Sequence, residues 1–145
     1  MASTNHLLGS SIALLARTWR GELDRRLSFL GLSQARWLVL LYLDWQPVPP
    51  TQTELANLLG VEGATLARLL DALEAQQLVR RVAVAEDRRI KRVELLPGTA
   101  ELIAQIDAIA SELNREVLQG IDEEELRICQ RVHAQMLANL NQEPC

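Results

Sequence analysis

Apolar residues recur at steps of three and four along most of the chain, and this spacing predicts amphipathic helices. The first apolar stripe covers residues 7–30 and ends at Gly31. A second helix is expected to begin at Ser33, a good N-cap residue, and to run to Trp45. The helical pattern then stops at three closely spaced prolines, which are Pro47, Pro49 and Pro50.

Two short helices are predicted after the prolines. Thr51 and Glu54 have the spacing of a capping box, which indicates that a helix opens there, and Gly60 ends it. The next helix begins near Gly63 and extends to about Gln77. Two short helices around a glycine-containing turn are typical of a helix-turn-helix.

The second of these helices has two distinct faces. Its leucines at positions 66, 69, 70 and 73 share one side, which we expect to be buried. Ala64, Arg68 and Asp71 lie on the opposite side at about 100° per residue. The pattern therefore predicts that Arg68 points away from the core.

Between residues 78 and 96 the helical period gives way to two short runs rich in valine and isoleucine. A charged hinge at residues 85–89 separates them, so we predict a β-hairpin. A hairpin directly after a helix-turn-helix is a wing, and residues 33–96 are therefore predicted to form a winged helix-turn-helix lobe.

Long helices are predicted on both sides of this lobe. Pro97 suits the first turn of a helix that continues to about Leu118, and Asp122 with Glu125 can cap the last helix. The apolar stripes in residues 1–30 and 97–145 are too long to be buried on so small a lobe, and self-association would cover them. The fold class expected is mainly α with a small β-hairpin, a single domain over residues 1–145 whose flanking helices make a homodimer.

Charge is unevenly distributed along the chain. The formal net charge of −4 argues against a nucleic-acid partner when taken alone. Residues 80–92, however, contain six basic side chains against two acidic ones, whereas residues 101–145 contain nine carboxylates against three arginines. The middle of the chain is therefore the segment that we expect to meet a polyanion.

Several fragments, in this order and spacing, resemble the MarR family of bacterial regulators over nearly the whole chain. The fragments are Leu32-Ser33-Gln34, Glu54-Leu55-Ala56, Leu59-Gly60, Thr65 with Arg68, Leu73-Glu74, Leu78-Val79-Arg80-Arg81 and Asp87-Arg88-Arg89. Arg17-Thr18-Trp19-Arg20, Trp37 and residues 87–92 are similar to the SlyA branch in particular. The resemblance implies a repressor or other transcription regulator that binds double-stranded DNA in the cytoplasm. The chain departs from the family pattern at residues 62–64 and 95–99, so the bases that it reads stay open.

The resemblance and the helix geometry together give a set of DNA-binding candidates. A helix fits the major groove, where arginine bonds guanine bidentately, so Arg68 is the candidate base reader, with Ala64 and Thr65 beside it. The resemblance implies that Arg88 or Arg89, in the wing, enters the adjacent minor groove. Two alternatives for Arg68 are an exposed, solvated side chain and a phosphate contact that reads no sequence.

Asp87 is the acidic residue among these candidates. A carboxylate repels phosphate, so we interpret Asp87 as a wing-shaping residue that pairs with a neighbouring arginine. The alternative is that Asp87 belongs to a solvated turn.

The resemblance also implies a second site for a small aromatic carboxylate, such as salicylate, that would release the DNA. Arg17, Arg20 and Trp37 are the candidates, because a guanidinium pairs with a carboxylate while an indole stacks on a ring. Trp37 also lies on an apolar stripe, so a plain core role is the alternative.

Other chemistry finds little support in the sequence. Glu125, Cys129 and His133 recur every four residues but extend over two turns, which is a poor geometry for one ion, so no metal and no cofactor are expected. We found neither a catalytic triad nor a glycine-rich phosphate loop, so an enzyme is the weakest interpretation. The stronger rival to a DNA-binding protein is a winged-helix protein-interaction module without DNA binding. We expect no membrane partner, because no apolar run is long enough to span a bilayer.

Overall fold

The computed structural model describes residues 4–142, which form six α-helices and one two-stranded antiparallel sheet. This confirms the predicted fold class. The elements are α1 (Thr4–Leu27), η1 (Ser28–Leu30), α2 (Gln34–Trp45), α3 (Gln52–Leu59), α4 (Gly63–Ala75), β1 (Val79–Val84), β2 (Asp87–Leu95), η2 (Pro97–Thr99), α5 (Ala100–Val117) and α6 (Glu123–Leu140). The chain divides into two compact units between Ser111 and Glu112, within α5.

The helix starts follow the local signals in the sequence. The Ser33 side chain accepts a hydrogen bond from the backbone N–H of Arg36 at the start of α2. At α3, Thr51 Oγ1 accepts from the Glu54 N–H at 3.1 Å, and Glu54 Oε2 accepts from the Thr51 N–H at 3.0 Å. These two bonds satisfy backbone donors that have no partner within the helix, so the predicted capping box is confirmed.

The first helix ends three residues earlier than the predicted stripe. Regular α-helix stops at Leu27, and Ser28–Leu30 form one tighter 3₁₀ turn. Gly31 then adopts a left-handed conformation with φ of 70°, which a glycine tolerates without strain. The predicted stop at Gly31 is therefore right, although the last turn has a different hydrogen-bond pattern.

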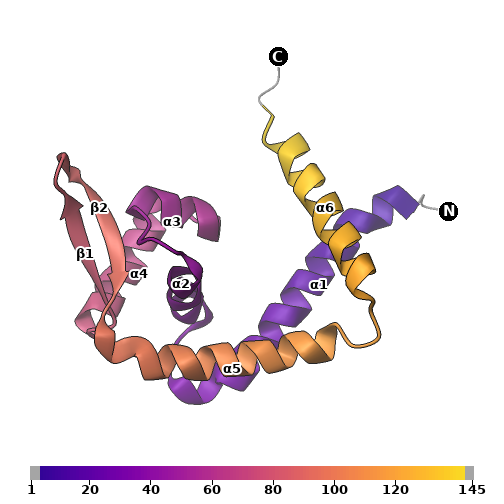
Figure 1. Cartoon of the computed structure of the whole chain (residues 1–145), viewed down its shortest axis with the longest axis horizontal. Coiled ribbons are helices and arrows are strands. Elements are labelled where there is room, and N and C mark those ends of the chain that lie inside the picture. The colour runs from indigo at the N-terminus through magenta and orange to yellow at the C-terminus, as the bar shows by residue number, and fades with distance from the viewer. Residues whose placement is uncertain (1–3, 143–145) are drawn as a thin grey trace. The chain divides into compact units, whose positions relative to one another are not determined.

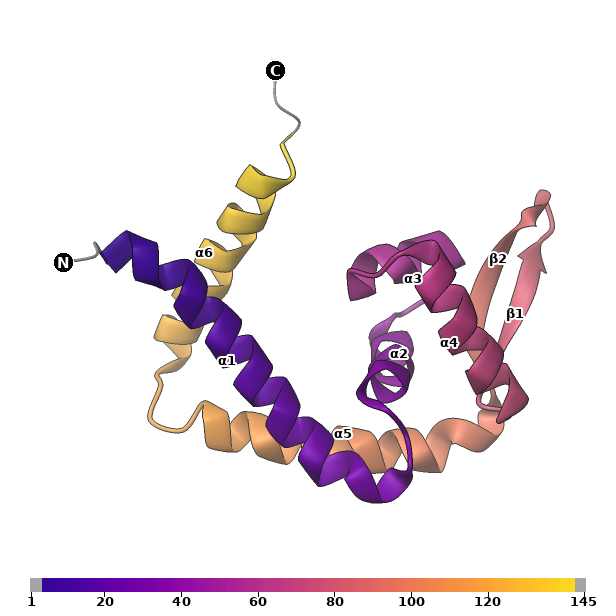
Figure 2. The same cartoon turned by 180° about the vertical axis from the view of Figure 1, so that it is seen from behind.

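The lobe has one apolar core, built by α2, α3, α4 and the hairpin. Helix α3 packs on both α2 and α4, and the hairpin follows α4 directly and lies beside it (Figures 1 and 2). Each fully buried leucine side chain contributes about 1.5–3 kcal/mol relative to exposure, so this core fixes how the short helices sit. The side chains that are 0% exposed include Leu40, Leu55, Leu66, Leu70, Leu73 and Val93.

The turn from α4 into β1 differs from the prediction. The helix ends at Ala75 rather than near Gln77, and Gln77 has a φ of +59°. A left-handed conformation costs a non-glycine residue about 1 kcal/mol, and two hydrogen bonds offset that cost here. The Leu78 N–H donates to the Leu73 carbonyl at 3.0 Å, and the Gln77 N–H donates to the Glu74 carbonyl at 2.9 Å.

The hairpin turn is shorter than the predicted hinge. Strands β1 and β2 pair from Val79 with Leu95 to Val84 with Asp87, with an irregularity between Ala83 and Val84. This irregularity brings Asp87 into the second strand, so only Ala85 and Glu86 remain between the strands. Asp87, Arg88 and Arg89 therefore begin β2 instead of lying in a loop.

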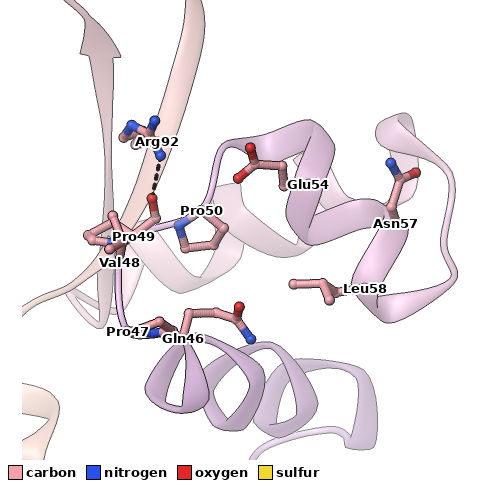
Figure 3. A pocket seen from close by; sticks show the side chains of 9 residues that line it. All are labelled: Gln46, Pro47, Val48, Pro49, Pro50, Glu54, Asn57, Leu58 and Arg92. Atoms are coloured by element: carbon pink, nitrogen blue, oxygen red, sulfur yellow. Dashed lines mark hydrogen bonds between the residues drawn. The ribbon is translucent and has the colours of Figure 1, made fainter.

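The loop before α3 is hydrogen-bonded to β2 near the base of the wing. The Val93 N–H donates to the Pro50 carbonyl at 2.9 Å, and Arg92 Nη1 donates to the Pro49 carbonyl at 2.7 Å (Figure 3). Thr51 also forms an isolated antiparallel bridge with Arg92. The proline cluster thus ends the preceding helix, and the residues that follow it pair briefly with β2 as a very short third strand.

Candidate nucleic-acid interface

Helix α4 presents a short polar face to solvent. Ala64, Arg68 and Asp71 are exposed and Thr65 is half-buried, while Leu66, Leu70 and Leu73 on the other face are fully buried and Leu69 is half-buried. The Arg68 guanidinium has no hydrogen-bond or ion-pair partner among residues 4–142. The structure therefore places Arg68 where the helical period predicts it, with its donors available to a partner.

The first residues of β2 carry two arginines in different states. Arg89 donates from its backbone N–H and from Nε to Asp87 Oδ1, at 3.0 and 3.2 Å, and from Nη2 to Asp87 Oδ2 at 3.3 Å. These bonds hold the pKa of Asp87 below its usual value. Arg88 is exposed and has no polar partner within the described part of the chain. The two candidates for the wing are therefore distinct, one free and one oriented by a carboxylate.

Arg81, at the start of the wing, binds two carboxylates of α4. Its Nε and Nη2 donate to Glu74 Oε1 and Oε2, each at 3.0 Å, and Nη2 also contacts Asp71 Oδ1. The pKa of Glu74 is lowered by the hydrogen bond from Arg81, and the pKa of Arg81 is raised in return. We call Asp71, Glu74 and Arg81 the Arg81 cluster.

The Arg81 cluster was not among the candidates from the sequence. Glu74 and Arg81 appeared only as fragments of the family pattern, because nothing in their spacing shows that they touch. Their seven-residue separation crosses the end of a helix and a tight turn. Opposite charges on either side of that turn were the available signal.

A polar groove runs between the start of α3 and the wing. Its volume is about 450 Å³, and three cationic residues, Arg81, Arg89 and Lys91, contribute to one side. Thr51, Gln52 and Thr53 line the side formed by α3. This groove is lined in part by α4 and β2, the elements that carry Arg68 and Arg88, and these two arginines have no polar partner in the described residues. The surface of α3, α4 and the wing is therefore the part of the lobe that is best suited to a polyanion.

A second pocket, of about 560 Å³, lies where the proline loop meets α3 and β2 (Figure 3). Glu54, Asn57 and Leu58 come from α3, and Arg92 comes from β2. One nitrogen of the Arg92 guanidinium already donates a hydrogen bond to the Pro49 carbonyl, so only the rest of the group is available to a ligand. The pocket therefore adjoins the contact that fastens the α3 entry to the wing.

The three effector candidates are not alike in the structure. Trp37 is 0% exposed, and its indole Nε1 donates to Asp24 Oδ1 at 3.0 Å. Its ring cannot stack on a ligand in this conformation, so the core alternative describes Trp37 here. Arg17 and Arg20 are exposed on α1 and have no polar partner among residues 4–142.

The remaining sequence candidates bring no further chemistry together. Cys129 Sγ lies 3.7 Å from His133 Nε2 on α6. Within residues 4–142, no three histidine, cysteine, aspartate or glutamate side chains are grouped so as to hold a metal ion. In the same residues, no helix is both long enough and apolar enough to cross a membrane.

Comparison with known proteins gives a consistent result. Residues 30–90 match the MarR family. The crystal structure of a transcriptional regulator, PA3341, is 59% identical, with a TM-score of 0.88, over 94% of this chain and 99% of that chain. The complex of S. aureus MepR with DNA is 23% identical, with a TM-score of 0.77, over 90% of this chain and 96% of MepR. The transcriptional regulator SlyA is 23% identical, with a TM-score of 0.79, over 92% of this chain and 93% of SlyA. The extent of these matches and the winged helix-turn-helix architecture lead to one conclusion: the chain belongs to the MarR family of transcriptional regulators.

Proposed function

We propose that this regulator binds double-stranded DNA sequence-specifically, as a homodimer on a pseudo-palindromic operator. The proposal is carried by one observation: Arg68 on α4 and Arg88 on the adjoining wing are both exposed, and neither has a polar partner among residues 4–142. An arginine on a helix reads guanine in the major groove, and an arginine on a wing is attracted to a narrow A·T-rich minor groove. The similar structure of S. aureus MepR was solved as a complex with DNA, and this supports DNA as the partner.

The DNA-binding lobe proposed is residues 33–96, with Ala64 and Thr65 next to the bases and Arg89 near the sugar-phosphate backbone. Ala64 is small enough to let the helix approach the base edges closely, and Thr65 offers a hydroxyl. Asp87 then acts as the wing-shaping residue, because its two oxygens hold the Arg89 side chain and backbone. The lobe binds and does not catalyse.

Residues 1–30 and 97–145 are proposed to make the dimer. The first half of α1 exposes Leu7, Leu8, Ile12, Leu14 and Leu15 by 37–58% of their surface. On α6, Ile128, Leu137 and Leu140 are exposed by 47–80%. Exposed apolar side chains on two helices are favourable to cover, and a second copy offers a matching surface. The two recognition helices would then lie about 34 Å apart, one turn of DNA.

A small aromatic carboxylate is proposed as the effector that releases DNA. Arg17 and Arg20 supply exposed cations on α1. Because the Trp37 ring is buried in this structure, a ligand could stack on that indole only in a different conformation. An effector that favours one dimer shape changes DNA affinity by a coupling of about 1–3 kcal/mol. The resemblance at residues 17–20, 37 and 87–92 supports membership of the SlyA branch. A regulator that binds DNA would act in the cytoplasm.

The decisive experiment is selection of bound genomic fragments by the purified protein, followed by mobility shift of the selected duplex and of a scrambled one. Tighter binding of the selected duplex supports the proposal. Equal and weak binding of both, even at low salt, would favour a protein-interaction module instead.

The effector has its own test, which uses salicylate as the probe. Calorimetry at millimolar salicylate should give a saturable heat, salicylate should weaken the operator complex, and Arg17→Ala should reduce both effects while DNA binding without salicylate is retained. No heat and no change in the operator complex would remove the effector from the proposal.

A further inference from the structure

The Arg81 cluster joins the two elements that are proposed to enter the DNA grooves. Arg81 belongs to β1 of the wing, and both of its carboxylate partners belong to α4. Asp71 lies three residues after Arg68 on the exposed face of the helix, and Glu74 lies one further turn along. The ion pairs therefore bridge the turn at residues 76–78, which connects α4, the proposed major-groove reader, to the wing.

The Arg81 side chain is much less exposed than those of Arg80 and Arg89 in the same basic segment. Its side chain is 18% exposed, compared with 62% for Arg80 and 91% for Arg89. Nε and Nη2 both donate to the Glu74 carboxylate, which is the two-pronged geometry that fixes a guanidinium in orientation as well as in distance. Two of its three guanidinium nitrogens are therefore engaged by carboxylates, which leaves little of the side chain for a phosphate.

Two hydrogen bonds from backbone N–H groups also stabilise the turn between α4 and β1. The Arg81 backbone N–H donates to Glu74 Oε1 at 3.0 Å, so the carboxylate binds both the side chain and the main chain of one residue. Three residues earlier, the Leu78 N–H donates to the Leu73 carbonyl across the left-handed Gln77 turn. Rotation of the wing about this turn would break all of these bonds together.

We propose that Arg81 is a positioning residue for DNA recognition: by binding Asp71 and Glu74 it fixes the angle between α4 and the wing, so that both elements meet their grooves at once. The proposal rests on the proposed DNA-binding function. It assigns no contact with DNA to Arg81, although Arg81 lies in the most basic stretch of the chain.

The carboxylates make the sharpest test, because simple electrostatics predicts the opposite result. Removing a negative charge beside DNA should strengthen binding, whereas removing a partner of Arg81 should weaken operator binding, by roughly tenfold if the coupling has the usual size for contacting residues. Glu74→Gln and Asp71→Asn are the test variants. Glu86→Gln is the matched control, because Glu86 is an exposed carboxylate at the wing turn with no polar partner in the described residues.

Arg81→Lys tests whether geometry or charge is needed. Lysine keeps the positive charge but has no planar fork, so it should not restore operator binding. Affinity is measured for each variant on the operator and on a scrambled duplex, with thermal melting as the fold control. A positioning role lowers the operator-to-scrambled affinity ratio, whereas a loss of folded protein lowers binding to both duplexes equally. Asp71 is 65% exposed, so Asp71→Asn keeps the test usable if the Glu74 variant does not fold.

Weaker operator binding by Asp71→Asn and Glu74→Gln, with Glu86→Gln unchanged or tighter, is the expected outcome. The proposal is overturned if the two variants bind as tightly as the wild type, or if Arg81→Lys binds normally. A wild-type protein that binds no duplex would instead defeat the proposed function, and the two failures are therefore distinguishable.

Discussion

The wing with α4 and the first half of α1 are exposed in opposite ways. In α4, Leu66, Leu70 and Leu73 are fully buried, and most of the exposed side chains on α4 and the wing are charged, although Val82 and Ile90 of the wing are 40% and 44% exposed. Arg81 and Arg89 are each held by a carboxylate. Along residues 7–15 of α1, the large side chains on the surface are leucines and an isoleucine, and the described charges begin later, at Arg17.

The difference shows that each surface is suited to a different kind of partner. A charged surface attracts a polyanion, and side chains that already have partners, such as Arg89, lose less conformational entropy when they bind it. An exposed apolar stripe gains free energy only when another apolar surface covers it. We therefore expect changes on α1 to act through assembly, and changes on the wing and α4 to act through DNA directly.

The largest effect is expected from a charge placed in the α1 stripe. Ile12→Glu should convert a dimer of about 32 kDa, twice the 16.2 kDa chain, into a monomer in sedimentation velocity. A monomer engages one half-site, so affinity for the operator should fall by about 10²-fold or more, the usual scale for losing a second linked contact.

The control for this prediction is Ala13→Glu, which adds the same charge on the side of α1 that faces away from the exposed leucines and Ile12. It should remain a dimer and bind DNA normally. If Ile12→Glu stays dimeric, or if the wild type is already monomeric, then the exposed apolar side chains of α1 do not form the dimer contact as proposed.

A smaller effect is expected from the two free arginines of the DNA-binding lobe, which should differ in kind. Arg68→Ala should cost about 1–3 kcal/mol on the operator and much less on scrambled DNA, because a base contact is lost. Arg88→Ala should weaken binding more evenly across A·T-rich duplexes and reduce the slope of log K against log salt by about 0.9.

These two variants are compared across a salt series, with circular dichroism to confirm folding. Arg127→Ala on α6 is the matched control, since Arg127 is an exposed arginine paired with Glu124 outside the lobe. If Arg68→Ala still prefers the operator to scrambled DNA as strongly as the wild type, and only Arg88→Ala loses that preference, then the wing reads the sequence.

Local signals made the lobe predictable from the sequence. The caps at Ser33 and Thr51, the stop at Gly31 and the outward direction of Arg68 each depend on residues within one turn of each other. The wing was predictable as a hairpin for the same reason. Its turn was misplaced because the irregularity beside Val84 depends on strand pairing, which the local sequence does not reveal.

The features missed from the sequence depend on contacts between elements. The Arg81 cluster forms across a turn in which Gln77 takes a conformation that favours glycine, and no local rule predicts that for glutamine. The sequence could not decide whether Trp37 is buried, because an apolar stripe is compatible with both a core residue and a pocket residue. Packing against the rest of the lobe and the bond to Asp24 decide its burial.

The smallest effect is expected at Asp87, where the charged surface can be loosened without removing a cation. Asp87→Asn should free the Arg89 side chain and lower operator affinity by roughly two- to fivefold at pH 7, since exposed ion pairs are weak and Arg89 must then be ordered when DNA binds. The pKa of Asp87 is held low by Arg89, so its carboxylate is ionised above the ordinary aspartate range, and the pair is lost only as the pH falls through the lowered value. The gap between wild type and variant should therefore persist from pH 8 down to about pH 5 and close in more acidic solution. Fluorescence anisotropy on one labelled operator at constant ionic strength measures it, with Glu86→Gln as the control for simple loss of a wing carboxylate. If Asp87→Asn binds more tightly than the wild type, the carboxylate merely repels DNA and does not orient Arg89.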